Sequence, residues 1–285
     1  MDLVIADYRI RLQSDTTLFL DSGHLPYVQT DAAQEADLFV EIREGLPMEL
    51  LDHKHCLFTA EDDQQRMYRI FEDDAQLLFQ LYNQDQPGTT QQIALLDETR
   101  TNWTVYTQTR AQGLLHPFKF PFTPILLYQL VVHKGGLLIH ASGIYDPEAN
   151  KGRLFTGFSG YGKSTMAGLW TDAGCRTIND DRLILRKQDN AYYMHNTPMY
   201  YPDEPKKTQL HDIHLIRHAS ENDSRPLQGI QALSRVMAFC IQNNHSAAQV
   251  QAYIRFIQEM LTQVRVFETG FLPQPSILEH IRSHD

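Results

Sequence analysis

The segment from Gly157 to Ser164 constrains the fold of this chain more than any other part of the sequence. It reads Gly-x-x-x-x-Gly-Lys-Ser, with Gly162 and Lys163 directly before the serine. An apolar run over residues 153–156 precedes it and favours a strand, and residues 164–170 favour a helix. The sequence therefore predicts a strand, a tight glycine loop and a helix in direct succession.

A loop of this kind is suited to binding phosphate. Glycine adopts backbone conformations that other residues avoid, so consecutive amides can converge on phosphate oxygens. The N-terminus of the following helix adds partial positive charge. We expect Lys163 to reach the outer phosphates of a nucleotide and Ser164 to hold a magnesium ion. The predicted nucleotide-binding residues are Gly157, Phe158, Ser159, Gly160, Tyr161, Gly162, Lys163, Ser164 and Thr165. The alternative is a glycine turn capped by Ser164, which the flanking strand and helix disfavour.

Two adjacent carboxylates follow the predicted helix. Gly174 is placed to end that helix, and residues 175–178 predict a second strand with Asn179, Asp180 and Asp181 at its end. Phosphoryl transfer requires a metal that neutralises the phosphates and a group that accepts or orients the proton of the nucleophile. Asp180 and Asp181 are therefore candidates for both tasks. Without the loop nearby, an acidic turn between two strands would explain the pair.

The combination resembles the superfamily of HPr kinase/phosphorylase and ATP-dependent phosphoenolpyruvate carboxykinase. Three segments carry the likeness in the family's order: residues 138–143 (LIHASG), 157–165 (GFSGYGKST) and 179–181 (NDD). The interval from Lys163 to Asp180 is similar to that of HPr kinases. The resemblance covers about residues 120–270 and is greatest to HPr-kinase-like proteins of bacteria.

The resemblance implies an α/β fold, in which an HPr kinase/PEP carboxykinase-like P-loop domain with a mixed sheet follows a smaller β-rich N-terminal domain. It implies ATP and magnesium as cofactors, with Ser164, Asp180 and Asp181 at the metal. It also implies His140, Lys163, Asp180 and Asp181 as catalytic residues, with His140 beside the transferred phosphate. Taken alone, a histidine in an apolar strand is more often a buried core residue. The division of labour between Asp180 and Asp181 stays open.

The predicted function is that of a kinase, a phosphotransferase that moves the γ-phosphoryl of ATP to a hydroxyl of a protein, peptide or small-molecule acceptor. The alternative is a non-catalytic nucleotide-binding module that engages a partner protein, although binding alone would not require the acidic pair. The sequence leaves open the acceptor, ATP versus GTP, and the reverse phosphorylase reaction. HPr kinases form hexamers, so a homo-oligomer also stays open. Residues 199–207 depart from the family pattern, and we expect them to form a loop beside the acceptor.

The composition of the chain limits its class, its partners and its location in the cell. A chain of 285 residues with 42% hydrophobic and 21% charged residues is typical of a soluble globular protein with ample core. The net charge of −10 opposes nucleic-acid phosphates, so nucleic acid is not an expected partner. Asp2 and Asp7 stand where a signal peptide would be basic and apolar, and the strongly apolar stretch 125–132 is too short to cross a membrane. Three widely spaced cysteines without a C-x-x-C pattern suit a reducing compartment. We therefore expect a cytoplasmic protein without membrane partners.

The chain is predicted to divide near residue 115, into a β-rich domain (1–115) and a nucleotide-binding domain (116–285). The first is expected to hold an antiparallel meander or small mixed sheet, with strands at 38–42, 56–59, 67–71, 77–82, 92–96 and 103–107. The second is expected to begin with a helix at 123–133 and to hold strands at 137–145, 154–157, 177–179, 183–187, 192–195 and 264–269. Further helices are predicted at 229–241, at 246–262 and from residue 275. His211, His214 and His218 could suggest a metal site, but an apolar strand interleaves them.

Overall fold

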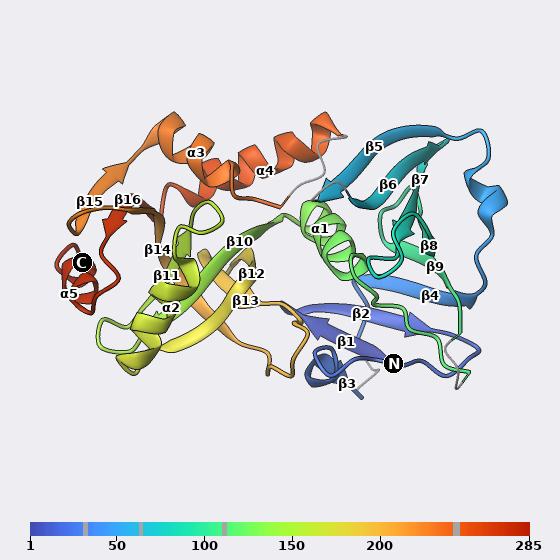
Figure 1. The fold of residues 1–285 in the computed structure, drawn as a ribbon, viewed down its shortest axis with the longest axis horizontal. Coiled ribbons are helices and arrows are strands. Elements are labelled where there is room, and N and C mark those ends of the chain that lie inside the picture. Colours follow the sequence, from blue (N-terminus) through green and yellow to red (C-terminus); the bar gives the residue numbers. More distant parts are fainter. Residues whose placement is uncertain (31–33, 63–64, 110–112, 242–245) are drawn as a thin grey trace. The chain divides into compact units, whose positions relative to one another are not determined.

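The chain has an α/β fold with two mixed β-sheets (Figure 1), in a computed structural model that describes residues 1–30, 34–62, 65–109, 113–241 and 246–285. These residues form two compact units. The first unit contains Met1–His133 and Pro198–Glu204. The second contains Lys134–Thr197 together with residues 205–241 and Ser246–Asp285.

The first unit is built on a nine-stranded sheet with the order β3-β1-β2-β4-β9-β8-β7-β6-β5. Its strands are β1 (Asp2–Ile5), β2 (Tyr8–Gln13), β3 (Val28–Gln29), β4 (Leu38–Glu44), β5 (His55–Asp62), β6 (Gln65–Asp73), β7 (Gln76–Tyr82), β8 (Thr90–Leu96) and β9 (Asn102–Thr107). Two short 3-10 helices, Leu25–Tyr27 and Met48–Leu51, connect them. β4 runs parallel to both β2 and β9, so the sheet is mixed. The six predicted strands are confirmed, and β1 to β3 were not predicted.

The helix α1 (Phe122–Lys134) groups with this first unit, apart from its last residue. The Phe122 ring packs edge-on against the buried Trp103 of β9, with 5.4 Å between the ring centroids. Gly135, with a φ of +82°, follows the helix directly and stops it. The division observed in the structure therefore falls after His133, whereas the sequence placed it near residue 115.

The second unit is built on a seven-stranded sheet with the order β11-β10-β12-β13-β14-β16-β15 and a further pairing of β11 with β14. Its strands are β10 (Gly136–Asp146), β11 (Lys151–Thr156), β12 (Arg176–Gln188), β13 (Ala191–Asn196), β14 (Lys207–His218), β15 (Asp223–Leu227) and β16 (Arg265–Phe271). β14 runs parallel to both β11 and β16. The carboxyl ends of these three strands therefore meet at one edge, where ligands of α/β sheets commonly bind.

The strand β12 corrects the sequence prediction. Two strands were expected, with Asp180 and Asp181 at the end of the first, but Arg176–Gln188 is one continuous strand with the acidic pair near its middle. The reason is its partner β10, which pairs with β12 from Arg186 back to Arg176 and so keeps the backbone extended. The pairing contains one bulge, because Ile178 is an extra residue between two paired positions of β12.

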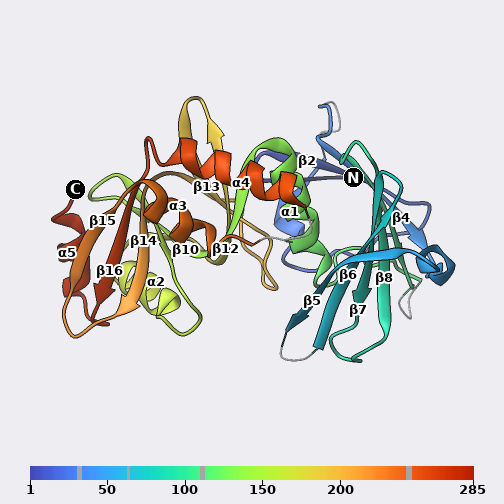
Figure 2. The same cartoon turned by 90° about the horizontal axis from the view of Figure 1, so that it is seen from above.

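Four helices complete the second unit: α2 (Lys163–Asp172), α3 (Gly229–Met237), α4 (Ala247–Met260) and α5 (Ser276–Arg282). α2 and α5 share a buried cluster in which Trp170 and Ile281 pack with Phe155 of β11. α4 is fixed to the sheet by Tyr253, whose hydroxyl accepts a hydrogen bond from the Leu138 amide at 3.0 Å. Figure 2 shows α3 and α4 together on the near side of this sheet. Across the described part of the chain, none of the helices combines the length and apolarity needed to cross a membrane.

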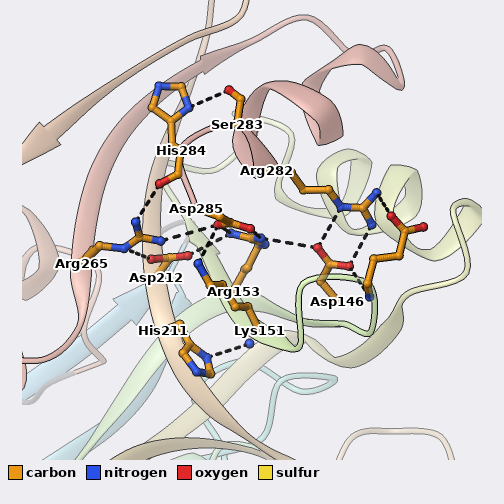
Figure 3. A network of polar contacts seen from close by, with 12 residues as sticks. Asp146, Lys151, Arg153, His211, Asp212, Arg265, Arg282, Ser283, His284 and Asp285 are labelled. Carbon is orange, nitrogen blue, oxygen red and sulfur yellow. Dashed lines mark hydrogen bonds and ion pairs between the residues drawn. The ribbon is translucent and has the colours of Figure 1, made fainter.

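A network of buried charged side chains joins three strands of the second unit to helix α5 and to Asp285 (Figure 3). Arg153 of β11 is fully buried and donates to Asp212 at 2.9 Å and to Asp285 at 2.6 Å. Arg282 of α5 donates twice to the buried Asp146, at 2.8 and 3.0 Å. Because every buried carboxylate in this group has a guanidinium partner, the network holds β10, β11, β14 and α5 together.

Candidate functional site

The glycine loop from Gly157 to Gly162 lies between β11 and α2, in the order of strand, loop and helix that the sequence predicted. β11 ends at Thr156, and α2 begins at Lys163 with Gly162 as its N-cap. Gly160 and Gly162 have φ angles of +80° and +89°, a region that favours glycine. A side chain at Gly162 would also place its Cβ 2.8 Å from Cζ of Phe271. Local backbone conformation and close packing therefore both require glycine at this position.

The ammonium of Lys163 lies inside this loop. Its Nζ donates to the carbonyl oxygen of Gly157 at 3.0 Å and to that of Phe158 at 3.2 Å. Burial lowers the pKa of Lys163, while the charges of Asp180 and Asp181 act in the opposite direction. The loop lysine and the acidic pair, separate in the sequence, therefore interact electrostatically in the folded chain.

Asp180 and Asp181 have different partners. The hydroxyl of Ser142 donates to Oδ1 of Asp180. Oδ1 of Asp181 lies 3.2 Å from Nδ1 of His140, and its Oδ2 accepts a hydrogen bond from Nε of Arg182 at 2.6 Å. One carboxylate is thus contacted by a neutral hydroxyl, and the other lies between an imidazole and a guanidinium.

These contacts also set the charge of Asp181. Burial alone would raise its pKa, but the hydrogen bond with His140 and the charge of Arg182 outweigh burial and lower the pKa. Asp181 is therefore ionised at neutral pH. Upstream, the side-chain oxygen of Asn179 accepts from the amides of Asp180 and Asp181 at 2.7 and 3.2 Å, which fixes the backbone directly after the bulge at Ile178.

His140 connects the acidic pair to the loop. Its side chain is 47% exposed, so it is not the buried core residue that an apolar strand would suggest. Its carbonyl oxygen accepts a hydrogen bond from the hydroxyl of Thr156, the last residue before the loop, at 2.7 Å. Its amide donates to the carbonyl of Phe239 at 3.1 Å. The pairing of β10 with β12 therefore brings His140 to the two aspartates, and the hydrogen bond from Thr156 joins His140 to the start of the loop that carries Lys163.

Four residues of this site were not assigned by the sequence: Ser142, Arg182, His218 and Phe239. Ser142 is two residues from His140 on a strand, and this spacing alone places both on one face. Arg182 directly follows the acidic pair. The positions of His218 and Phe239 carry no such signal, because they depend on how β14 and the end of α3 pack.

The three histidines of β14 do not converge on one point. Nδ1 of His211 accepts from the amide of Gly152 at 3.1 Å, Nδ1 of His214 lies 2.9 Å from the Thr269 hydroxyl, and Nε2 of His218 lies 3.0 Å from the carbonyl oxygen of Gly160. Within the described ranges, no group of three or more histidine, cysteine or acidic side chains is arranged to hold a metal ion.

The residues assigned to magnesium have suitable chemistry. Asp180 and Asp181 are half-buried carboxylates, and Ser164 is exposed in the first turn of α2. Magnesium prefers oxygen ligands and is usually bound through one or two carboxylates, with water and substrate phosphates completing its shell. Two aspartates and a hydroxyl at the start of α2 fit this requirement.

The segment expected to form a loop beside the acceptor has no regular structure from Met199 to Lys206. Tyr200 is 86% exposed. The segment is nevertheless anchored at its ends: a Cβ on Gly23 would lie 1.6 Å from the Met199 carbonyl oxygen, and the Lys206 amide donates to Oδ1 of Asn196 at 2.7 Å. Closure of this loop over an acceptor stays a prediction.

No protein-family model matches the chain, and no curated protein sequence matches it. Among solved structures, the Hpr(Ser) kinase/phosphatase from Coxiella burnetii aligns with 52% of this chain and 95% of its own, at 14% sequence identity and a TM-score of 0.34. This likeness is a weak one at the level of the fold.

Proposed function

We propose that this protein is a magnesium- and ATP-dependent kinase that transfers the γ-phosphoryl group to a hydroxyl acceptor. The observation that carries the proposal is the position of His140, whose carbonyl accepts a hydrogen bond from Thr156 directly before the glycine loop of Lys163 and whose ring lies 3.2 Å from Asp181 on β12. A phosphate loop supplies binding, and the carboxylates supply what the chemical step needs in addition.

The loop amides and the N-terminus of α2 bind the phosphates of the nucleotide. Lys163 moves from the loop carbonyls to the outer phosphates, where its charge opposes the charge that develops during transfer. Ser164 and Asp181 would hold magnesium, whose positive charge would neutralise part of the phosphate charge. Asp181 suits this task because His140 and Arg182 keep it ionised and fixed.

Asp180 is the proposed general base. The acceptor oxygen bonds to the γ-phosphorus, the bond from that phosphorus to the β–γ bridging oxygen breaks, and ADP leaves with the electron pair. The hydroxyl proton passes to a carboxylate oxygen of Asp180. Ser142, which donates to the same carboxylate, orients it. His140 lies beside this reaction centre, next to Asp181.

Nucleotide binding is tested by melting the protein with and without magnesium-ATP. Binding to the native state raises the melting temperature by mass action, and Lys163→Ala should remove most of that increase. Lys187→Ala is the matched control, because Lys187 is exposed on the same unit and pairs with Glu259. An unchanged melting temperature in saturating ATP and GTP would exclude the nucleotide site.

Catalysis is tested separately by following label from γ-labelled ATP into cell extract and into water, with Lys163→Ala as the blank. Transfer that depends on Lys163 supports the kinase. Binding of ATP without transfer or hydrolysis would instead support the non-catalytic nucleotide-binding module.

A further inference from the structure

An exposed aromatic ring stands within the glycine loop. Phe158 directly follows Gly157, and 57% of its surface is exposed. The contacts of such a loop with phosphate come from backbone amides and from the lysine, so a large apolar side chain adds nothing to them. Exposure of the ring to water also costs free energy that contact with another apolar group would recover. The ring is therefore suited to contact a group other than phosphate.

Other rings hold Phe158 in place. It packs edge-to-face against Phe239 and against Tyr161, with 5.2 and 5.5 Å between the ring centroids. Tyr161 contacts the ring of His218 at 5.8 Å, and Nε2 of His218 lies 3.0 Å from the carbonyl oxygen of Gly160. Edge-to-face packing gives each ring a defined orientation. Phe158 and Phe239 therefore form one fixed apolar surface, which we call the phenylalanine surface.

The backbone of the phenylalanine surface is bonded to residues of the proposed reaction centre. The carbonyl oxygen of Phe158 accepts a hydrogen bond from Nζ of Lys163 at 3.2 Å. The carbonyl oxygen of Phe239 accepts one from the amide of His140 at 3.1 Å. The proposed function assigns Lys163 to the outer phosphates and His140 to the surroundings of the transferred phosphate. The phenylalanine surface therefore belongs to the end of the nucleotide that is opposite to the base.

Two groups meet at this end in the proposed reaction, the γ-phosphoryl group and the acceptor. The phosphoryl group is charged and gains nothing from contact with an apolar ring. The acceptor presents its hydroxyl to Asp180, and the atoms on either side of that hydroxyl come to lie on the surrounding protein surface. An apolar surface at this place therefore favours an acceptor that carries an apolar group near its hydroxyl.

The shape of the phenylalanine surface favours a peptide over a small molecule. More than half of Phe158 is accessible, so the ring does not enclose what it contacts. Small ligands are bound mainly in concave sites that bury most of their surface. A peptide instead gathers its affinity from several side chains along an extended backbone, each of which can contact an open surface.

On the basis of the kinase function proposed above, on which this inference rests, we propose that Phe158 and Phe239 bind an apolar side chain of a peptide or protein acceptor, close in sequence to the serine that is phosphorylated. The phenylalanine surface selects the acceptor and takes no part in the chemical step. It favours phenylalanine or leucine over charged side chains, because apolar rings cannot compensate a charge for its lost water.

The test is a kinase assay with γ-labelled ATP, magnesium and a set of synthetic serine peptides. The serine is fixed, and each neighbouring position is set in turn to phenylalanine, leucine, alanine, lysine or glutamate. For the wild-type protein we expect a position at which phenylalanine or leucine gives a kcat/KM about 5- to 30-fold higher than alanine, the effect of partly burying an apolar side chain. Lysine and glutamate at that position should be no better than alanine.

The ratio of kcat/KM between the phenylalanine and alanine peptides is the readout, because general damage to the loop lowers both values and cancels. Phe158→Ala and Phe239→Ala should each reduce this ratio to less than about twofold. Phe158→Leu, which keeps an apolar side chain, should retain most of it. Ile230→Ala is the matched control, since Ile230 is 74% exposed at the opposite end of α3 from Phe239, and this variant should keep the wild-type ratio.

A wild-type protein that prefers no apolar side chain at any position would overturn the inference, and so would an undiminished ratio in Phe158→Ala. If magnesium-ATP raises the melting temperature but no serine peptide accepts label, the peptide acceptor is excluded while the nucleotide site stands. If the protein does not bind ATP at all, the proposed function fails and this inference fails with it.

Discussion

At the scale of single residues, the acidic pair shows how neighbouring side chains acquire different environments. Asp180 and Asp181 have the same chemistry and adjacent positions, yet the first is contacted by a hydroxyl and the second by two nitrogen groups. The bulge at Ile178 and the side chain of Asn179 set the backbone that makes this difference. The structure therefore gives the two carboxylates different surroundings, which the sequence could not distinguish.

Replacing either aspartate by asparagine keeps its size and removes its charge. We expect both variants to lose at least about 100-fold in turnover, because each removes a proton acceptor or a metal ligand. They should differ in magnesium dependence: Asp181→Asn should require more magnesium for half-maximal turnover, whereas Asp180→Asn should not. Magnesium titrations of the residual activity measure this, and equal shifts in the two variants would refute the proposed division.

Ser142→Ala tests the orientation of Asp180. The hydroxyl contacts the carboxylate but is assigned no contact with substrate, so we expect a loss of turnover smaller than that of Asp180→Asn and little change in ATP affinity. Ser142→Thr keeps the hydroxyl and should restore part of the turnover. A loss in Ser142→Ala as large as in Asp180→Asn would instead assign the serine a direct role.

At the scale of elements, the segment from β11 to α2 contains one glycine that its conformation requires and one that it does not. Gly162 has a positive φ and faces Phe271, whereas Gly168 lies within α2, where an added Cβ would meet no atom within 4 Å outside the helix's own backbone. The same substitution is therefore expected to have opposite effects at these two positions.

Gly162→Ala should destabilise the protein by more than about 1 kcal/mol, because a left-handed conformation costs about that much before the clash with Phe271 is counted. Gly168→Ala should stabilise it by about 0.5–1 kcal/mol, since alanine is the better helix former. Midpoints of urea unfolding report both changes. Stabilisation by Gly162→Ala would show that the glycine loop has another conformation.

At the scale of the whole molecule, the buried charges of the second unit join segments far apart in the sequence. Arg153 contacts Asp146, Asp212 and Asp285 while its own side chain is 1% exposed. Such a network is costly to break, because removal of one partner leaves other buried charges without compensation.

Arg153→Met should lower the free energy of unfolding by about 3–5 kcal/mol, the typical cost of breaking a buried ion pair. Lys187→Met, which removes the exposed pair with Glu259, should cost less than about 1 kcal/mol. Urea unfolding of both variants provides the comparison. Equal effects of the two substitutions would show that the buried network contributes little to stability.

Because of this network, we also expect the stability of the folded protein to depend on pH. Burial alone would raise the pKa of Asp285, but hydrogen bonds from Arg153 and Lys151 outweigh it and lower the pKa to about 2, from an ordinary value of 3.8. A carboxylate with a lowered pKa in the folded state stabilises the fold above its unfolded pKa and loses this effect as pH falls through the folded value. Stability should therefore decline from about pH 4 to pH 2.

Melting temperatures measured across that interval test this expectation. Asp285→Asn should melt at a lower temperature than wild type near neutral pH and should decline less on acidification. A variant that follows the wild-type decline in parallel would show that Asp285 does not contribute to the acid response.

The sequence by itself determined the features that depend on neighbouring residues. The strand, glycine loop and helix around Gly157, the six alternating strands of residues 38–107 and the helix α1 all follow from local periodicity and turn residues. The hairpin of β1 and β2 escaped this reasoning, because its turn places Ala6 and Asp7 at positive φ without the usual glycine or asparagine.

Tertiary structure decided which of these features meet. The pairing of β10 with β12 brings His140 to Asp181 and keeps β12 continuous through the acidic pair, and the parallel pairing of β11, β14 and β16 carries His218 to the loop. Such pairings depend on hydrogen bonds and packing between strands far apart in the chain, which no local pattern encodes. The sequence thus determined that a glycine loop before a helix and an acidic pair are present, and the tertiary structure alone decided that His140 lies between them.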